Sequence, residues 1–123
     1  MRIRITWGTE SVEGTLNDSD TAAKLAAALP QSSSANTWGD EVYFSVPVEA
    51  ELEADPQVVV DPGTICFWVQ GSSIALPYGP TPVSEGDECR LVTAVNIIGK
   101  LDGDPRALAS IQDGDAITIE AAD

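Results

Sequence analysis

Trp38–Pro47 has the sequence Trp-Gly-Asp-Glu-Val-Tyr-Phe-Ser-Val-Pro and sets the pattern for the rest of the chain. Alternate residues belong to an apolar and a polar set, namely Val42, Phe44, Val46 and Val48 against Glu41, Tyr43 and Ser45. This period of two predicts a β-strand with unlike faces. The polar face carries a carboxylate and a phenol beside a tryptophan, which makes it a candidate functional surface.

The length and composition predict one globular domain over residues 1–123. A chain of 123 residues that is 43% apolar can bury a core without metal or disulfide support. No apolar run approaches the ~20 residues of a membrane-spanning helix, and we find no secretory signal. We therefore expect a cytoplasmic protein.

The chain is strongly acidic, with 20 Asp and Glu against 6 Lys and Arg and a net charge of −14. Such a surface repels phosphate backbones and anionic lipids, so we expect neither a nucleic acid nor a membrane as partner. Lysine is scarce, with only Lys24 and Lys100. This composition favours adaptation to a salt-rich cytoplasm, where counterions screen self-repulsion, and an ordinary acidic protein is the alternative.

The chain contains no histidine, which excludes Ser-His, Cys-His and His-ligated zinc chemistry. Cys66 and Cys89 are expected to be reduced, although a disulfide between them stays open. Pairs of aspartates bracket glycine at 102–104 and 113–115 without an EF-hand loop, so turn formation explains them. We expect no metal and no cofactor.

Short strands separated by turns account for most of the chain. N-capping residues at 17–20 predict a helix over about 19–29, and Asp104-Pro105 predicts a short helix over about 104–111. The polar, serine-rich Gln31–Asn36 is expected to be a loop, and the acidic Glu49–Asp55 a solvated strand continuation or loop. Strands are expected at 64–70, 74–78, 91–98 and 116–120, in addition to an opening hairpin. The pattern predicts a mainly β fold, a single closed or nearly closed antiparallel barrel.

Four segments, Asn36–Ser45, Gly63–Trp68, Tyr78–Pro82 and Ala94–Lys100, resemble the motifs of a prokaryotic family of small cyclophilin-like proteins. The resemblance covers essentially the whole chain in order. It implies a cyclophilin-like barrel of about eight strands closed by helices, in a family whose cellular role is largely unassigned. Similar barrels occur in subunits of urea-amide and oxoproline hydrolases.

Enzymatic cyclophilins isomerise prolyl peptide bonds with an arginine set among aromatic residues, glutamine and histidine. Here histidine is missing and none of the arginines lies within the matching motifs. The isomerase residues therefore do not carry over, and a shared fold does not bring a shared function.

The polar residues within the motif strands give two open interpretations. They could line an outer pocket for a small molecule or a short peptide, or they could satisfy the backbone. The candidate ligand-binding residues are Trp38, Glu41, Tyr43, Trp68, Tyr78, Thr81 and Asn96. We expect Glu41 to be partly shielded from water and hydrogen-bonded.

The leading hypothesis is a binding module without prolyl isomerase activity. The alternatives are an enzyme, either a residual prolyl isomerase or an amide-handling activity with Glu41 as acid or base, and a protein-interaction subunit. A homodimer is one assembly that the sequence allows.

Overall fold

The computed structural model describes residues 1–122. Its strands are β1 (Arg2–Trp7), β2 (Glu10–Leu16), β3 (Gln31–Ser34), β4 (Asn36–Thr37), β5 (Glu41–Ser45), β6 (Gln57–Val60), β7 (Thr64–Trp68), β8 (Ser73–Pro77), β9 (Cys89–Leu101) and β10 (Ala116–Ala121). Its helices are α1 (Asp20–Ala28) and the 3-10 helix η1 (Pro105–Ser110). Neither helix is long and apolar enough to cross a bilayer, as judged over the described residues.

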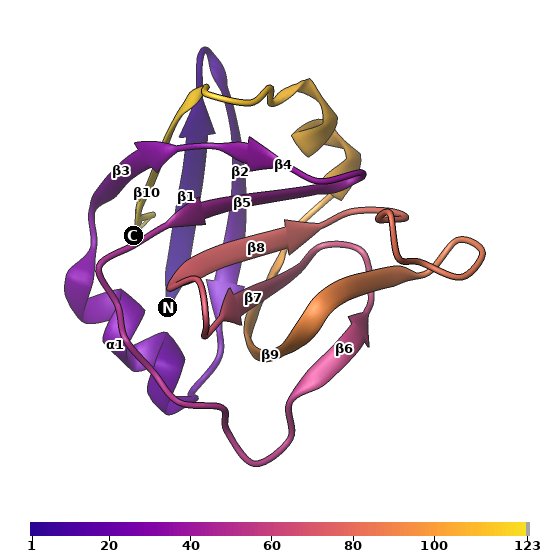
Figure 1. The fold of residues 1–123 in the computed structure, drawn as a ribbon. Coiled ribbons are helices and arrows are strands. Elements are labelled where there is room, and N and C mark those ends of the chain that lie inside the picture. Colours follow the sequence, from indigo (N-terminus) through magenta and orange to yellow (C-terminus); the bar gives the residue numbers. More distant parts are fainter. Residues whose placement is uncertain (123) are drawn as a thin grey trace.

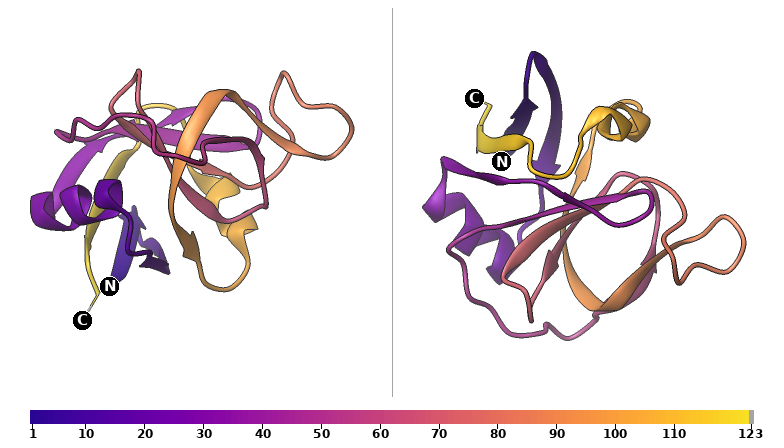
Figure 2. Two further views of the ribbon diagram at one scale, coloured as in Figure 1. Left: turned by 90° about the horizontal axis from the view of Figure 1, so that it is seen from below. Right: turned by 45° about the horizontal axis from the view of Figure 1, so that its top comes forward.

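Nine strands form one antiparallel sheet in the order β3-β10-β1-β2-β9-β7-β8-β5-β4. The two end strands, β3 and β4, are neighbours in sequence, so the sheet curls into a nearly closed barrel (Figure 1). The two helices lie on opposite sides of this barrel (Figure 2). The predicted fold class is confirmed.

The barrel interior is filled by the apolar halves of the alternating strands. Ile3 and Ile5 of β1 have no exposed surface, and Phe44 of β5 is 1% exposed. Leu25 of α1 and Leu108 of η1 pack against the same cluster. Alternating burial therefore fixes which side of each strand faces inward, because a slip of one residue would turn every apolar side chain outward.

Both predicted helices are present with the expected caps. The Ser19 hydroxyl accepts a hydrogen bond from the amide of Ala22 at 3.2 Å at the start of α1. The Asp104 carboxylate accepts one from the amide of Arg106 at 3.0 Å at the start of η1. Each cap satisfies an amide that has no partner within the helix.

The prediction of a loop at Gln31–Asn36 is wrong. Residues 31–34 form β3, which pairs with β10, and residues 36–37 form β4, which pairs with β5. Serine gives no apolar alternation to recognise, and β3 is stabilised by backbone pairing and by contacts such as Ser32 Oγ to Thr118 Oγ1 at 3.0 Å. Glu49–Asp55 is a loop, one of the two forms expected for it.

A second layer covers part of the outside of the barrel. Residues 96–100 of β9 pair with β7, whereas Cys89, Arg90 and Val95 pair with β6, so the long strand bends from the sheet into this layer (Figures 1 and 2). A small apolar cluster of Cys66, Ala75, Leu91 and Val95 fills the space beneath it. The outer face of β7 and β8 is therefore covered and buried as well.

Candidate functional site

The two faces of β5 separate as the alternation predicts. Val42 and Phe44 belong to the barrel core, whereas Tyr43 packs against the small cluster on the outer side. Glu41 shares the face of Tyr43 and pairs across the sheet with Pro77 of β8. The carboxyl group of Glu41 thus projects from the barrel into the region covered by the second layer.

Glu41 is buried despite its outward direction, with 6% of its surface exposed. Its Oε1 atom is buried without a hydrogen-bond partner, so the hydrogen bond expected for this side chain is missing at that atom. Loss of hydration by burial raises the pKa of Glu41 from its ordinary 4.5 to about 7. At neutral pH the group is therefore poised between its neutral and ionised forms.

A pocket of about 210 Å³ opens beside this carboxyl group. Three of the residues that line it are aromatic, and most of the others are aliphatic. The lining residues are Trp38, Glu41, Tyr43, Trp68, Ala75, Leu91, Val92, Thr93 and Val95. One buried carboxyl group on apolar and aromatic walls is an arrangement that small-ligand sites use.

Trp68 is held firmly in the wall. Its ring packs edge-on against Tyr43, with centroids 6.0 Å apart and planes at 86°. Its indole Nε1 donates a hydrogen bond to Thr93 Oγ1 at 3.2 Å, and Thr93 donates in turn to Gln70 at 3.3 Å. Gly71 makes room for the ring, because a Cβ there would lie 2.3 Å from a ring carbon. The wall therefore keeps its shape without a ligand.

Trp38 is placed by a turn that rests on the proline-rich loop. Gly39 has φ of +60°, and a Cβ there would lie 2.9 Å from Thr81 Cα, so glycine is needed both for the backbone angle and for the close approach. The amide of Asp40 donates to the carbonyl of Pro80 at 2.9 Å, and the amide of Tyr78 donates to the carbonyl of Asp40 at 2.8 Å. The loop at 78–82 thus braces the turn that carries Trp38 and leads into Glu41.

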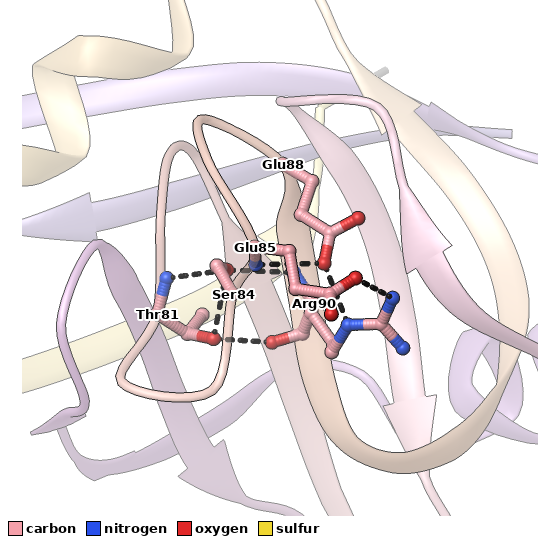
Figure 3. A network of polar contacts seen from close by, with 5 residues as sticks. All are labelled: Thr81, Ser84, Glu85, Glu88 and Arg90. Carbon is pink, nitrogen blue, oxygen red and sulfur yellow. Dashed lines mark hydrogen bonds and ion pairs between the residues drawn. The ribbon is translucent and has the colours of Figure 1, made fainter.

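The continuation of this loop is tied to the start of β9 (Figure 3). Ser84 Oγ accepts hydrogen bonds from the amides of Thr81 at 2.9 Å and Arg90 at 3.2 Å, and the Thr81 hydroxyl donates to the carbonyl of Arg90. Glu88 accepts from the amide of Glu85 and from Arg90 Nε, and both contacts hold the pKa of Glu88 below its ordinary value. This network fixes the entry of β9 next to the pocket residue Leu91.

Four of the seven expected site residues meet in the pocket, namely Trp38, Glu41, Tyr43 and Trp68. The other three do not line it. Tyr78 packs against the barrel core, and the Thr81 hydroxyl is used inside its own loop. Asn96 is 2% exposed; it accepts from the amide of Glu53 at 2.8 Å and donates to Thr21 Oγ1 at 3.0 Å and the carbonyl of Glu51 at 2.9 Å. Its amide fastens the acidic loop to α1.

The pocket residues that the sequence did not single out are Ala75, Leu91, Val92, Thr93 and Val95. Four of these come from the bent half of β9. Three of the four, Leu91, Thr93 and Val95, lie at every second position and so share one face of the strand. Their period of two is a signal for a second apolar face on this strand.

Both cysteines are buried near Glu41. Burial, and then the charge of Glu41, raises the pKa of the Cys66 thiol, and the pKa of the Cys89 thiol is raised first by burial and also by nearby carboxylates. A thiol with a raised pKa is a poor nucleophile and a poor metal ligand. Within residues 1–122 no three Asp, Glu or Cys side chains are grouped as a metal site.

Comparison with known proteins gives a family and two structural neighbours. A family model described as cyclophilin-like matches residues 1–120. The solution structure of the hypothetical protein AF2241 from Archaeoglobus fulgidus is 35% identical, with a TM-score of 0.84 over 99% of this chain and 95% of that one. McbB, solved in complex with tryptophan, is 17% identical, with a TM-score of 0.67 over 98% of this chain and 44% of its own; it shares the fold alone. None of the curated proteins compared with the chain matches it.

Proposed function

The chain belongs to the cyclophilin-like family, and on that premise we propose that it is a binding protein that holds a small molecule, or one side chain of a short peptide, beside Glu41. The resemblance inferred from the sequence motifs is thereby confirmed. Because one fold serves many functions, the proposal rests on the site and not on the barrel.

The single observation that carries the proposal is the unpartnered Oε1 atom of Glu41 at a pocket. Buried polar atoms in folded proteins usually have a partner, since an unmade hydrogen bond costs about 1–3 kcal/mol. The surrounding protein offers apolar and aromatic surface. A ligand with one hydrogen-bond donor and an apolar body would complete the site.

The size of the pocket supports a compact ligand. Its volume of about 210 Å³ is below the ~300–1,000 Å³ of sites for drug-sized molecules. A fragment with a single ring, or one side chain, fits this volume better than an extended peptide does.

Absence of prolyl isomerase activity is part of the proposal. The four arginines make ion pairs with carboxylates, for example Arg2 with Glu13 at 2.9 Å and Arg90 with Glu88 at 2.6 Å. None of the four lines the pocket. The positioned cationic donor of an isomerase site therefore has no counterpart there.

The setting that we propose is a salt-rich cytoplasm. The net charge of −14, the two lysines and two buried unpaired thiols support it.

The test is a screen of single-ring fragments in which binding is monitored through the indole N–H signals in two-dimensional NMR spectra. Trp38 and Trp68 line the pocket, whereas the indole of Trp7 donates to Ser110 Oγ at 2.8 Å elsewhere and serves as an internal control. We expect fragments that shift the first two signals and leave that of Trp7 in place. Glu41→Gln should weaken the binding of these fragments, while the rest of the spectrum keeps the dispersion of a folded protein. A screen in which no fragment moves Trp38 or Trp68 would refute the proposal.

An amide-handling enzyme is the second candidate, and the pKa of Glu41 near 7 is the observation that favours it. A general acid or base works best when its pKa lies close to the ambient pH. A rate of small-amide turnover whose pH profile changes slope near pH 7, and which is lost in Glu41→Gln, would favour this candidate over simple binding.

A further inference from the structure

Resting on the proposed binding role, we propose that the pocket selects organic monocations, in which a compact ammonium group is carried on an apolar body. Three features of the site point to this class of ligand: a buried carboxyl group without a counterion, aromatic walls and the sign of the surrounding charge.

The carboxyl group of Glu41 has no counterion among the described residues. None of the pocket residues is a lysine or an arginine, and burial is the sole cause of the shift in its pKa. Arg90 precedes the lining residue Leu91, but its guanidinium group is engaged by Glu88 and Glu85. A buried carboxylate without a partner is strongly disfavoured, and a bound cation would supply the missing charge where water cannot screen it.

The walls favour a cation over a neutral donor. Trp38, Tyr43 and Trp68 bring three aromatic rings to one pocket. Aromatic faces attract ammonium groups, most strongly where water is displaced, and they also bury an apolar body. The carboxylate and the rings thus bind the ammonium group, and the rings also bind the apolar body.

The charge of the whole protein acts in the same direction. A net charge of −14 raises the local concentration of cations and repels anions. An anionic ligand would in addition meet the buried carboxyl group of Glu41 in the pocket. A carboxylate of equal size is therefore expected to be excluded.

Cation binding should be linked to the ionisation of Glu41. The titratable groups around it are Tyr43 on its own strand, Cys66 on β7 and Cys89 on β9, with exposed Asp40 preceding it. Both thiols have a raised pKa and stay neutral below pH 8, so Glu41 sets the pH dependence. With a pKa of about 7, its ionised fraction increases roughly thirtyfold from pH 5.5 to pH 8.

The experiment compares three probes of equal size, which are benzylammonium, benzyl alcohol and benzoate, by calorimetry at constant ionic strength. At pH 8 we expect benzylammonium to bind at least about tenfold more tightly than benzyl alcohol, and benzoate not to bind. Lowering the pH to 5.5 should weaken benzylammonium about thirtyfold, because protons compete for Glu41. The amine itself stays protonated over this range.

Two variants separate the local charge from the net charge. Glu41→Gln should remove both the preference and the pH dependence. Glu10→Gln takes the same charge from an exposed side chain outside the pocket and should keep both. The wild-type pH dependence is sufficient by itself should the Glu41 variant fold poorly.

The outcomes for this inference and for the proposed binding role are distinct. Benzyl alcohol that binds as tightly as benzylammonium, with shifts at Trp38 and Trp68, overturns cation selection and leaves a binding pocket. An affinity for benzylammonium that does not change with pH overturns it as well. If none of the three probes and no fragment of the screen moves these signals, both proposals fail.

Discussion

Replacing Glu41 by glutamine should change how the free energy of unfolding depends on pH. Glutamine keeps the shape of the side chain but does not titrate. The pKa of Glu41 is about 7 in the folded protein against an ordinary 4.5, because burial removes water from the carboxylate. This is the reverse of the usual case, in which a carboxylate gains a partner on folding and its pKa decreases.

The sign of the effect follows from proton binding. Below pH 4.5 Glu41 is neutral in both the folded and the unfolded chain and contributes no pH dependence. Between pH 4.5 and 7 the unfolded chain releases its proton while the folded chain keeps it, so the wild type loses stability as the pH rises. The loss is complete only well above pH 7, where the folded chain has also released this proton. A pKa of about 7 in the folded chain against 4.5 in the unfolded chain corresponds to about 3 kcal/mol of stability.

Urea unfolding at fixed salt, followed by circular dichroism, measures this effect. The quantity of interest is the stability of Glu41→Gln minus that of the wild type, because all other carboxylates titrate in both proteins. Between pH 5 and pH 8.5 this difference should grow by roughly 2–3 kcal/mol in favour of the variant, which corresponds to a shift in melting temperature on the order of 10 °C for 123 residues. Glu10→Gln, an exposed position, is the control for net charge. A difference that stays flat, or that falls with pH, would refute a carboxyl group buried without a partner.

Three further predictions test other parts of the structure. Stability should rise from about 0.05 to 2 M potassium chloride, because salt screens a net charge of −14; a melting temperature that stays flat or falls would contradict salt adaptation. Prolyl isomerase activity on a standard peptide should stay at background, because the pocket has no positioned cationic donor, and a rate that survives removal of trace contaminants would show otherwise. Asn96→Ala should destabilise the protein by roughly 2–3 kcal/mol in urea unfolding through the loss of three hydrogen bonds, and a wild-type midpoint would show that the acidic loop is held by other contacts.

Local alternation made much of the site predictable from sequence. Val42 and Phe44 lie inside the barrel, and Glu41 and Tyr43 outside, because the side chains of a strand alternate whatever the rest of the chain does. Capping residues likewise located both helices, since caps act within one turn.

The same alternation argues against two of the expected pocket residues. Tyr78 shares its phase with Ile74 and Leu76, which are core residues, so it belongs on the inner side. Asn96 shares its phase with Ile98, another core residue, and faces α1 through Thr21. Their polarity groups both with Glu41, but the alternation of the segments that carry them places both on the other side of the sheet.

The second layer could not be predicted from sequence. The sequence pattern predicts no strand at β6, and the pairing of β6 with β9 joins residues such as Gln57 and Val95 that are far apart in the chain. Beside it, β9 carries a bulge against β7, where the pairing shifts between Ile65 and Cys66. A bulge lets a strand leave one sheet at an angle, but no local pattern announces the partner that it meets.

This layer gives Glu41 its chemistry. A glutamate on the outer face of a barrel would ordinarily be solvated, and its own strand contributes only Tyr43 to the pocket around it. Leu91 and Val95 from the bent half of β9 cover that face, so the residues that perturb the pKa of the carboxyl group are apolar and distant in sequence. No charged neighbour is needed, since removing water is enough to raise the pKa of an acid. The raised pKa of Glu41 therefore arises from long-range packing, whereas its position on the outer face follows from a local period of two.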